Sequence, residues 1–154
     1  MYFCLRKRRY KLSGQAPLRN ENITTKKRTM KKAINTKAAP AAIGPYSQAI
    51  AVGNLVYTSG QLPIDPATGE FAVGGIKEQT RQSLTNVEAI LKEAGLTMGD
   101  VVKTMVFLAD MNDFADMNSV YSEFFSEPYP ARSAVAVKAL PKGALVEIEV
   151  VAGK

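Results

Sequence analysis

The sequence predicts an α+β domain in which one mixed β-sheet carries two helices on one of its faces. Apolar residues recur at helical spacing in two segments, and short runs of strand-like composition lie before, between and after these segments. The chain has 154 residues, which is enough for one compact domain and too few for two of ordinary size. The expected order is two strands, a helix, a strand, a helix and two more strands.

The first elements are two short strands joined by a tight turn. Residues 49–52 (AIAV) and 55–58 (LVYT) are separated by a Gly-Asn pair, and both residues of this pair tolerate the positive φ of a two-residue hairpin loop. The second strand is expected to continue to Gln61. A loop rich in turn-forming residues follows at 63–69.

The first helix is expected over residues 76–94, with Gly95 as a cap at its C-terminal end. Its apolar positions recur at helical spacing: Ile76, Leu84, Val87, Ile90, Leu91 and Ala94. Residues 101–108 (VVKTMVFL) are then almost continuously apolar. This composition is typical of a central strand covered on both faces.

The second helix is expected to begin at Asn112 or Asp113, either of which can cap it, and to end before Pro128. Its apolar stripe consists of Phe114, Met117, Val120, Tyr121, Phe124 and Phe125. Both helices are therefore amphipathic, which means that each has one face to bury against the sheet.

The last two strands are expected at 132–139 and 145–151, joined as a hairpin. A one-residue slip would expose an apolar set, so the alternation assigns each residue to a face. The core face would hold Val135, Val137, Val146, Ile148 and Val150. The opposite face would hold Arg132, Ala134, Ala136, Lys138, Glu147 and Glu149. This interpretation predicts that Arg132 and Glu147 lie on the same side of the sheet.

A sheet face built from arginine, glutamate and small alanines leaves room for an occupant. The occupant could be a ligand or the sheet of another subunit. The strand at 101–108 requires cover on both faces, while two helices suffice for one. We therefore expect an oligomer whose subunits pack their sheet faces together.

The net charge of +6 is distributed unevenly along the chain. Residues 1–29 contain nine basic side chains and one acidic one, and residues 30–154 contain eleven basic and thirteen acidic ones. We interpret residues 1–29 as a basic disordered leader or an extension from an upstream start, and residues 30–154 as the folded domain. An organelle transit peptide is the alternative for the leader, and otherwise we expect a cytoplasmic protein.

The composition excludes several classes of chemistry. The chain has no histidine, and its one cysteine, Cys4, lies in the leader, so catalysis by Ser-His or Cys-His pairs, zinc fingers and an intrachain disulfide are excluded. No apolar run approaches the ~20 residues of a membrane-spanning helix. Chemistry must come from carboxylate, guanidinium, hydroxyl, amino or backbone groups.

Arg132 and Glu147 are the strongest candidates for a site. A guanidinium stays charged and donates two parallel hydrogen bonds to a substrate carboxylate, and a carboxylate beside it can position water. The alternatives are an exposed residue or an intersubunit ion pair for Arg132, and a solvated strand face for Glu147. Tyr46, Ser59 and Asn118, taken singly, are as easily structural.

Four motifs together resemble the RidA (YjgF) family. They are IGPYSQA at 43–49, YTSGQLP at 57–63, PARS at 130–133 and VEIE at 146–149. The resemblance covers residues 30–154 and implies a chorismate-mutase-like fold, a homotrimer with a central barrel, and three clefts between subunits. It also implies hydrolysis of reactive 2-enamine and 2-imino acids, such as 2-aminoacrylate and 2-iminobutanoate, to 2-keto acids and ammonia, without a metal or organic cofactor.

The resemblance also implies roles for individual residues. Arg132 would bind the substrate carboxylate, and Glu147 would position or activate water. The other pocket residues would be Tyr46, Ser59, Gly60, Asn118 and Ala134. Many deaminases of the family have cysteine at the last of these positions, so activity depends on whether that position contributes a thiol or its backbone carbonyl.

Three functions follow from these observations. The first is an imine and enamine deaminase, a hydrolase of small imino acids. The second is a binder or sensor of small keto or imino acids, because the arginine would hold a carboxylate whether or not water attacks. The third is RNA binding or cleavage, against which the acidic balance of residues 30–154 argues. We expect no membrane partner.

Overall fold

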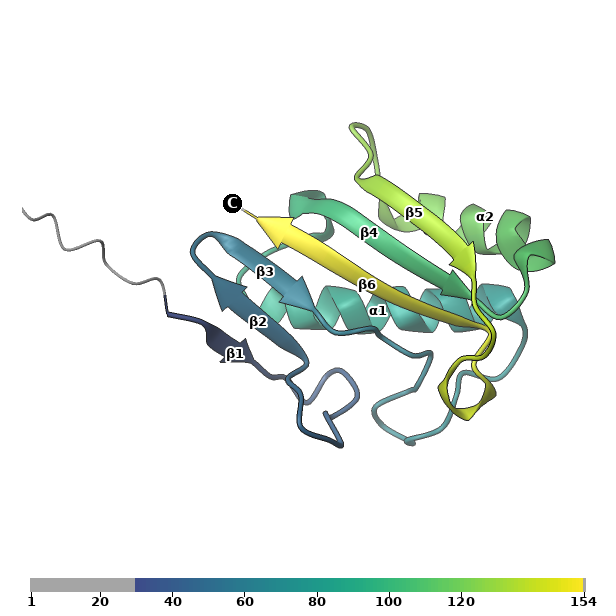
Figure 1. The fold of residues 1–154 in the computed structure, drawn as a ribbon, viewed down its shortest axis with the longest axis horizontal. Helices are drawn as coiled ribbons and strands as arrows, with labels where there is room; N and C mark the ends of the chain where they lie inside the picture. The colour runs from purple at the N-terminus through teal and green to yellow at the C-terminus, as the bar shows by residue number, and fades with distance from the viewer. Residues whose placement is uncertain (1–29, 154) are drawn as a thin grey trace, which may run out of the picture.

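The computed structural model describes residues 30–153 and contains one six-stranded sheet with two helices (Figure 1). The strands are β1 (Lys32–Ile34), β2 (Ala49–Val52), β3 (Leu55–Thr58), β4 (Val101–Leu108), β5 (Ala131–Ala136) and β6 (Val146–Gly153). The helices are α1 (Ile76–Glu93) and α2 (Phe114–Phe124). The strand order is β1-β2-β3-β6-β4-β5, with only β4 and β5 parallel, which confirms a mixed sheet of the α+β class.

Both helices lie on one face of the sheet, behind it in the view of Figure 1, and no helix of residues 30–153 covers the other face. The core forms between α1, α2 and this face. It contains the apolar helix residues expected from the sequence, including Leu84, Val87 and Met117, none of which is exposed. The single chain therefore covers one face of β4: Thr104, Val106 and Leu108 are buried, while the residues between them are partly exposed.

The early elements match the sequence expectations closely. β2 and β3 form the hairpin, with Gly53 at a φ of 63° in its turn, and α1 ends at Glu93 before Gly95 at a φ of 73°. β3 ends at Thr58, and Gln61 then forms an isolated bridge with Ile148. β1 was not expected, because three residues of an edge strand carry too little pattern to be recognised.

The start of α2 matches the expected position, because Asp113 is its N-cap and Phe114 its first residue. The Asp113 side chain, however, makes no capping hydrogen bond. A short 3-10 turn, Met111–Asp113, leads into the helix, and Asp110 caps this turn: its Oδ1 accepts a hydrogen bond of 2.8 Å from the backbone N–H of Asn112. The side-chain cap therefore lies three residues before the N-cap of the helix itself.

The expected hairpin of the last two strands is wrong. β5 pairs only with β4, in parallel, and β4 separates it from β6. Arg132 lies opposite Thr104, and Glu147 lies opposite Phe107, which is an odd number of residues further along β4. Because side chains alternate between faces, Arg132 points to the side of the helices and Glu147 to the open side.

The same register corrects the expected faces of β5. Ala134 and Ala136 lie opposite buried residues of β4, and Ala134 packs against the core, whereas Val135 faces the open side and is 44% exposed. The sequence assignment failed because it placed the larger apolar residue in the core. The pairing of β5 with β4 decides the face, so the smaller residue Ala134 packs against the core and the larger Val135 does not.

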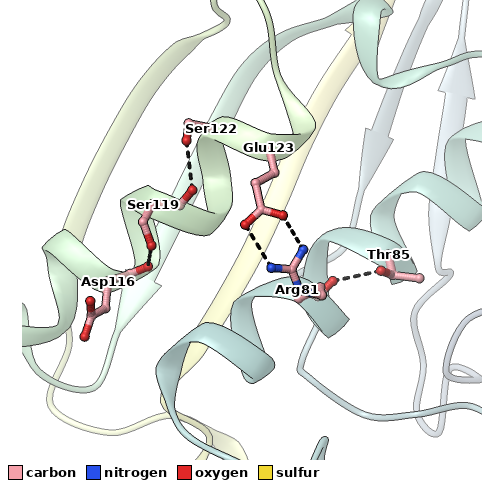
Figure 2. Close-up of polar contacts among 6 residues, drawn as sticks. All are labelled: Arg81, Thr85, Asp116, Ser119, Ser122 and Glu123. Atoms are coloured by element: carbon pink, nitrogen blue, oxygen red, sulfur yellow. Dashed lines mark hydrogen bonds and ion pairs between the residues drawn. The ribbon is translucent and has the colours of Figure 1, made fainter.

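Two ion pairs link α1 and α2 on their solvent side. Figure 2 shows the guanidinium of Arg81 facing the Glu123 carboxylate, with Nη1 and Nη2 at 2.5 and 2.9 Å from the two oxygens. Lys77 Nζ lies 3.2 Å from Asp116. Both pairs are exposed, so they contribute little to stability. No helix within residues 30–153 is long and apolar enough to cross a membrane.

Candidate active site

A cavity of about 790 Å³ lies beside the C-terminal end of β3 and the N-terminal end of β6. Its lining includes four residues expected from the sequence: Tyr46, Ser59, Gly60 and Glu147. Its volume is within the range of small-molecule sites. The segment between β1 and β2 and the loop after β3 supply most of its walls.

Glu147 is the acidic side chain of this cavity. Its carboxyl lies against the α-carbon of Gly60, where a Cβ would overlap the carboxylate and lie 2.9 Å from Glu147 Cγ. Burial raises the pKa of Glu147 above its ordinary value of 4.5, and the charge of Glu149 raises it further. Such a carboxyl takes up a proton more readily near neutral pH than an exposed glutamate does.

Buried side-chain amides hold the walls of the cavity in place. Gln48 accepts a hydrogen bond from Thr36 N and donates to the carbonyls of Thr36, Ala39 and Pro40. Asn86 on α1 donates to the carbonyls of Leu62 and Ile64 at 3.0 and 2.9 Å. Gln79 accepts from Leu145 N at 2.8 Å, just before β6. Sequence patterns did not predict a role for these three residues. For the two on α1, a polar residue on the apolar face of the helix was an available signal.

The hydroxyl and cationic groups of the cavity complete its polar lining. Ser59 donates a hydrogen bond of 2.7 Å to the carbonyl of Ser47, and Tyr46 is 52% exposed. Lys37 and Lys142 also line the cavity. Lys142 has a φ of 56°, a left-handed conformation that costs a non-glycine residue about 1 kcal/mol. The cavity therefore offers positive charge at its edge and a proton-binding carboxyl inside.

The other three expected site residues lie elsewhere in the chain. Arg132 Nη1 donates a hydrogen bond of 2.8 Å to Asn118 Oδ1 on α2, and Ala134 is two residues further along the same face of β5. None of the three lines the cavity of Glu147. Within one chain the arginine and the carboxylate therefore lie in two separate places.

Comparison with known proteins identifies the family of the chain. The family model described as Endoribonuclease L-PSP matches residues 36–154, more than three quarters of the chain. The chain belongs to the RidA family.

Members of the RidA family with known names are similar over most of this chain. The chain is 58% identical to a RutC family protein of Pyrococcus horikoshii, over 81% of this chain and 99% of that one. It is 53% identical to the 2-iminobutanoate/2-iminopropanoate deaminase of Bos taurus, over 80% and 90% of the two chains. The structure of Escherichia coli TdcF with bound serine matches with a TM-score of 0.76 at 49% identity, over 80% and 98%.

The described residues of this RidA-family chain limit the chemistry that its own side chains can perform. Within residues 30–153, no group of three or more cysteine, aspartate or glutamate side chains is arranged to hold a metal ion. The groups described above can bind an anion, through arginine or lysine, and can exchange a proton, through the Glu147 carboxyl. These suffice for addition of water to an electrophilic carbon.

Proposed function

We propose that this protein is a deaminase that hydrolyses 2-enamine and 2-imino acids to 2-keto acids and ammonia. The observation that carries the proposal is the Glu147 carboxyl, which lies in the cavity against Gly60 with a raised pKa. The deaminase names of relatives from cattle, goat and Escherichia coli, at 52–53% identity, support the same reaction. The proposed substrates are of the 2-aminoacrylate and 2-iminobutanoate type.

The proposed active site contains residues from two subunits. From strand spacing and register, the α-carbons of Arg132 and Glu147 are about 14 Å apart, on opposite faces of the sheet. In a 2-imino acid, the carboxylate and the imine carbon are directly bonded. The two side chains of one chain therefore cannot serve the same molecule, whereas Arg132 of one subunit and Glu147 of the next can.

The open face of the sheet supports such an assembly. Val135, Met105 and Phe107 all project from this face, and Val135 and Tyr57 are each 44% exposed. A helix-free apolar face of this kind is typical of a sheet that packs on a partner. We propose the homotrimer with a central barrel and three intersubunit clefts, a chorismate-mutase-like assembly.

The reaction then proceeds by addition of water and loss of ammonia. Arg132 binds the carboxylate, and the enamine, once protonated on carbon, is an electrophilic iminium. Water adds to the iminium carbon while Glu147 accepts its proton. Glu147 then returns this proton to the amino nitrogen, and the C–N bond breaks as the hydroxyl oxygen forms the carbonyl. The released ammonia takes the hydroxyl proton and leaves as ammonium, together with the keto acid. Tyr46 and Ser59 line the same cavity, and Gly60 leaves room for the carboxyl.

The experiment generates the imine in place. An amino-acid dehydratase acting on threonine releases 2-aminobut-2-enoate, and formation of 2-oxobutanoate is followed with and without the full-length protein. We expect wild type to accelerate release of the keto acid and Arg132→Ala and Glu147→Ala to leave the spontaneous rate. A wild-type chain that leaves the spontaneous rate unchanged would contradict the deaminase proposal.

Two other functions predict different results in the same samples. A binder of keto acids would bind 2-oxobutanoate in calorimetry without accelerating its formation. RNA cleavage is a second candidate because the family description names an endoribonuclease. The balance of eleven basic and thirteen acidic side chains in residues 30–154 disfavours it, since neutralising phosphates requires a basic surface. Cleavage of RNA by full-length protein but not by Glu147→Ala would favour it.

A further inference from the structure

The Arg132 side chain contacts residues along one face of α2. Its guanidinium carbon lies 4.5 Å from the ring centroid of Tyr121 and 5.4 Å from that of Phe114, and Nη1 donates to Asn118. Positions 114, 118 and 121 are four and three residues apart and therefore share a face of the helix. Two aromatic rings and one amide hold this side chain between them.

All three groups that hold Arg132 are neutral. Within residues 30–153, the ion pairs within 4 Å are Arg81 with Glu123 and Lys77 with Asp116, and neither involves Arg132. Arg81 differs from Arg132 in this respect, because both of its terminal nitrogens face a carboxylate (Figure 2). Arg132 uses one of its five N–H groups for Asn118, so most of its donors and its whole charge remain available for an anion.

Tyr121 is itself held firmly. It is 5% exposed, and its hydroxyl oxygen lies 2.9 Å from Oγ1 of Thr104, which is fully buried on β4 directly opposite Arg132. Its ring centroid lies 4.4 Å from that of Phe125. Burial also raises the pKa of Tyr121, so the phenol stays neutral and donates or accepts within the pair with Thr104.

We propose that Tyr121, Asn118 and Thr104 form a neutral clamp that positions Arg132 to receive the substrate carboxylate. Tyr121 supplies a flat surface for the guanidinium, Thr104 fixes that ring, and Asn118 occupies one edge of the fork. The free edge is then presented to the anion without a competing protein carboxylate. The inference rests on the proposed function for the identity of the anion, and it adds positioning roles for Tyr121 and Thr104.

The first test compares the ring with its hydroxyl in the full-length protein. Tyr121→Leu removes the surface, whereas Tyr121→Phe combined with Thr104→Val keeps the ring and removes both partners of the hydroxyl pair. We expect Tyr121→Leu to raise the KM for imine at least tenfold with kcat changed less than threefold. The double variant keeps the ring but removes the hydroxyl pair that fixes it, so KM should rise about threefold, clearly less than in Tyr121→Leu, while leaving neither hydroxyl unpaired preserves packing. Val120→Ala, at another buried position of α2, should lower stability and leave KM unchanged.

The second test concerns neutrality and remains decisive if Tyr121→Leu does not fold. Asn118→Asp places a carboxylate at the Nη1 edge and neutralises the guanidinium, and Asn118 is only partly buried. Calorimetry with 2-oxobutanoate should show at least tenfold weaker binding for Asn118→Asp. Binding within threefold of wild type in this variant would overturn the clamp, as would an equal loss in Tyr121→Leu and the double variant.

The two tests separate the clamp from the deaminase proposal. Binding of 2-oxobutanoate requires the arginine and no turnover. If wild type binds the keto acid with the expected variant pattern but does not accelerate imine hydrolysis, the clamp stands and the proposed function fails. If turnover depends on Glu147 and Arg132 while Tyr121→Leu keeps both KM and keto-acid affinity, the proposed function stands and the clamp fails.

Discussion

Arg132 and Glu147 lie on opposite faces of one sheet, with β4 between their strands. Neutral aromatic and amide groups surround the arginine, and the carboxyl lines a cavity. This arrangement separates the proposed anion-binding group from the proposed proton-transfer group within the chain. The proposed function accordingly depends on bringing a second subunit to each cavity.

Glu147→Gln is expected to stabilise the protein at pH 7 while abolishing deaminase activity. Burial raises the pKa of Glu147, so the native state binds its proton more tightly than the unfolded state, and ionisation at neutral pH lowers the stability. The difference between wild type and variant should shrink as the pH falls to 4.5 and below, where the carboxyl is protonated in both states. Urea unfolding at pH 4 and pH 7 measures this. Activity should fall at least ~10²-fold.

The pH profile of deaminase activity in the wild-type protein supplies a check on the same group. The proposed mechanism needs the base form of Glu147, so the acidic limb of kcat/KM should lie above the ordinary glutamate value of 4.5. A limb at or below that value, or a Gln variant less stable than wild type at pH 7, would argue against a buried, functional carboxyl.

Gly60→Ala is expected to inactivate the protein without unfolding it. A Cβ at this position overlaps the Glu147 carboxylate, the mobile end of a side chain, so the carboxyl must move. We expect a ~10²-fold loss of kcat, since proton transfer requires hydrogen-bond distance. Gly99→Ala is the matched control, because the nearest atom to a Cβ there is Thr97 Oγ1 at 3.5 Å, an ordinary contact outside the cavity. Full activity in Gly60→Ala would remove Glu147 from the mechanism.

Val135→Asp is expected to break the oligomer. Val135 projects from the open apolar face of the sheet, and a carboxylate there would be desolvated on assembly. Light scattering should give about three times 16.7 kDa for wild type and 16.7 kDa for the variant, with deaminase activity lost together with the trimer. Val73→Asp, at a loop position that is 95% exposed, should change neither mass nor activity. A monomeric wild type with full activity would refute the two-subunit site.

Asn86→Ala is expected to loosen the cavity wall and destabilise the fold by about 2–4 kcal/mol. Its fully buried amide bonds the carbonyls of Leu62 and Ile64, and removing it leaves both without this donor. Urea unfolding reports the loss, together with a lower kcat/KM. Gln82→Ala removes only the donor to Asn86 Oδ1 and should cost less than ~1 kcal/mol. Equal effects of the two substitutions would show that the wall does not depend on Asn86.

Local patterns in the sequence were enough to predict most of the elements. The hairpin at Gly53, α1 with its buried stripe, and β4 all depend on spacing within a few residues, and the structure confirms them. Four residues of the cavity, Tyr46, Ser59, Gly60 and Glu147, were predicted from motifs that resemble the RidA family, and Glu147 also from the alternation along its strand. The family was therefore accessible before any coordinates.

Local sequence patterns could not predict how the last two strands are arranged relative to each other. Alternation along β5 is compatible with either set of small apolar residues facing the helices, and loop length alone did not exclude a hairpin with β6. Only the insertion of β4 between them, which follows from long-range strand pairing, decides the face of Arg132. Likewise, no local pattern marks the contact of Tyr121 with Arg132, because it joins a helix to a strand.

The amino-acid sequence by itself determined the composition of the elements, the absence of histidine chemistry and the family, since these depend on residue identity and short-range spacing. Tertiary structure alone decided which functional groups meet. Glu147 on β6 contacts Gly60, which follows β3, and Arg132 on β5 contacts Tyr121 on α2. These residues are distant in sequence and are brought together only when the core closes around α1, α2 and one face of the sheet.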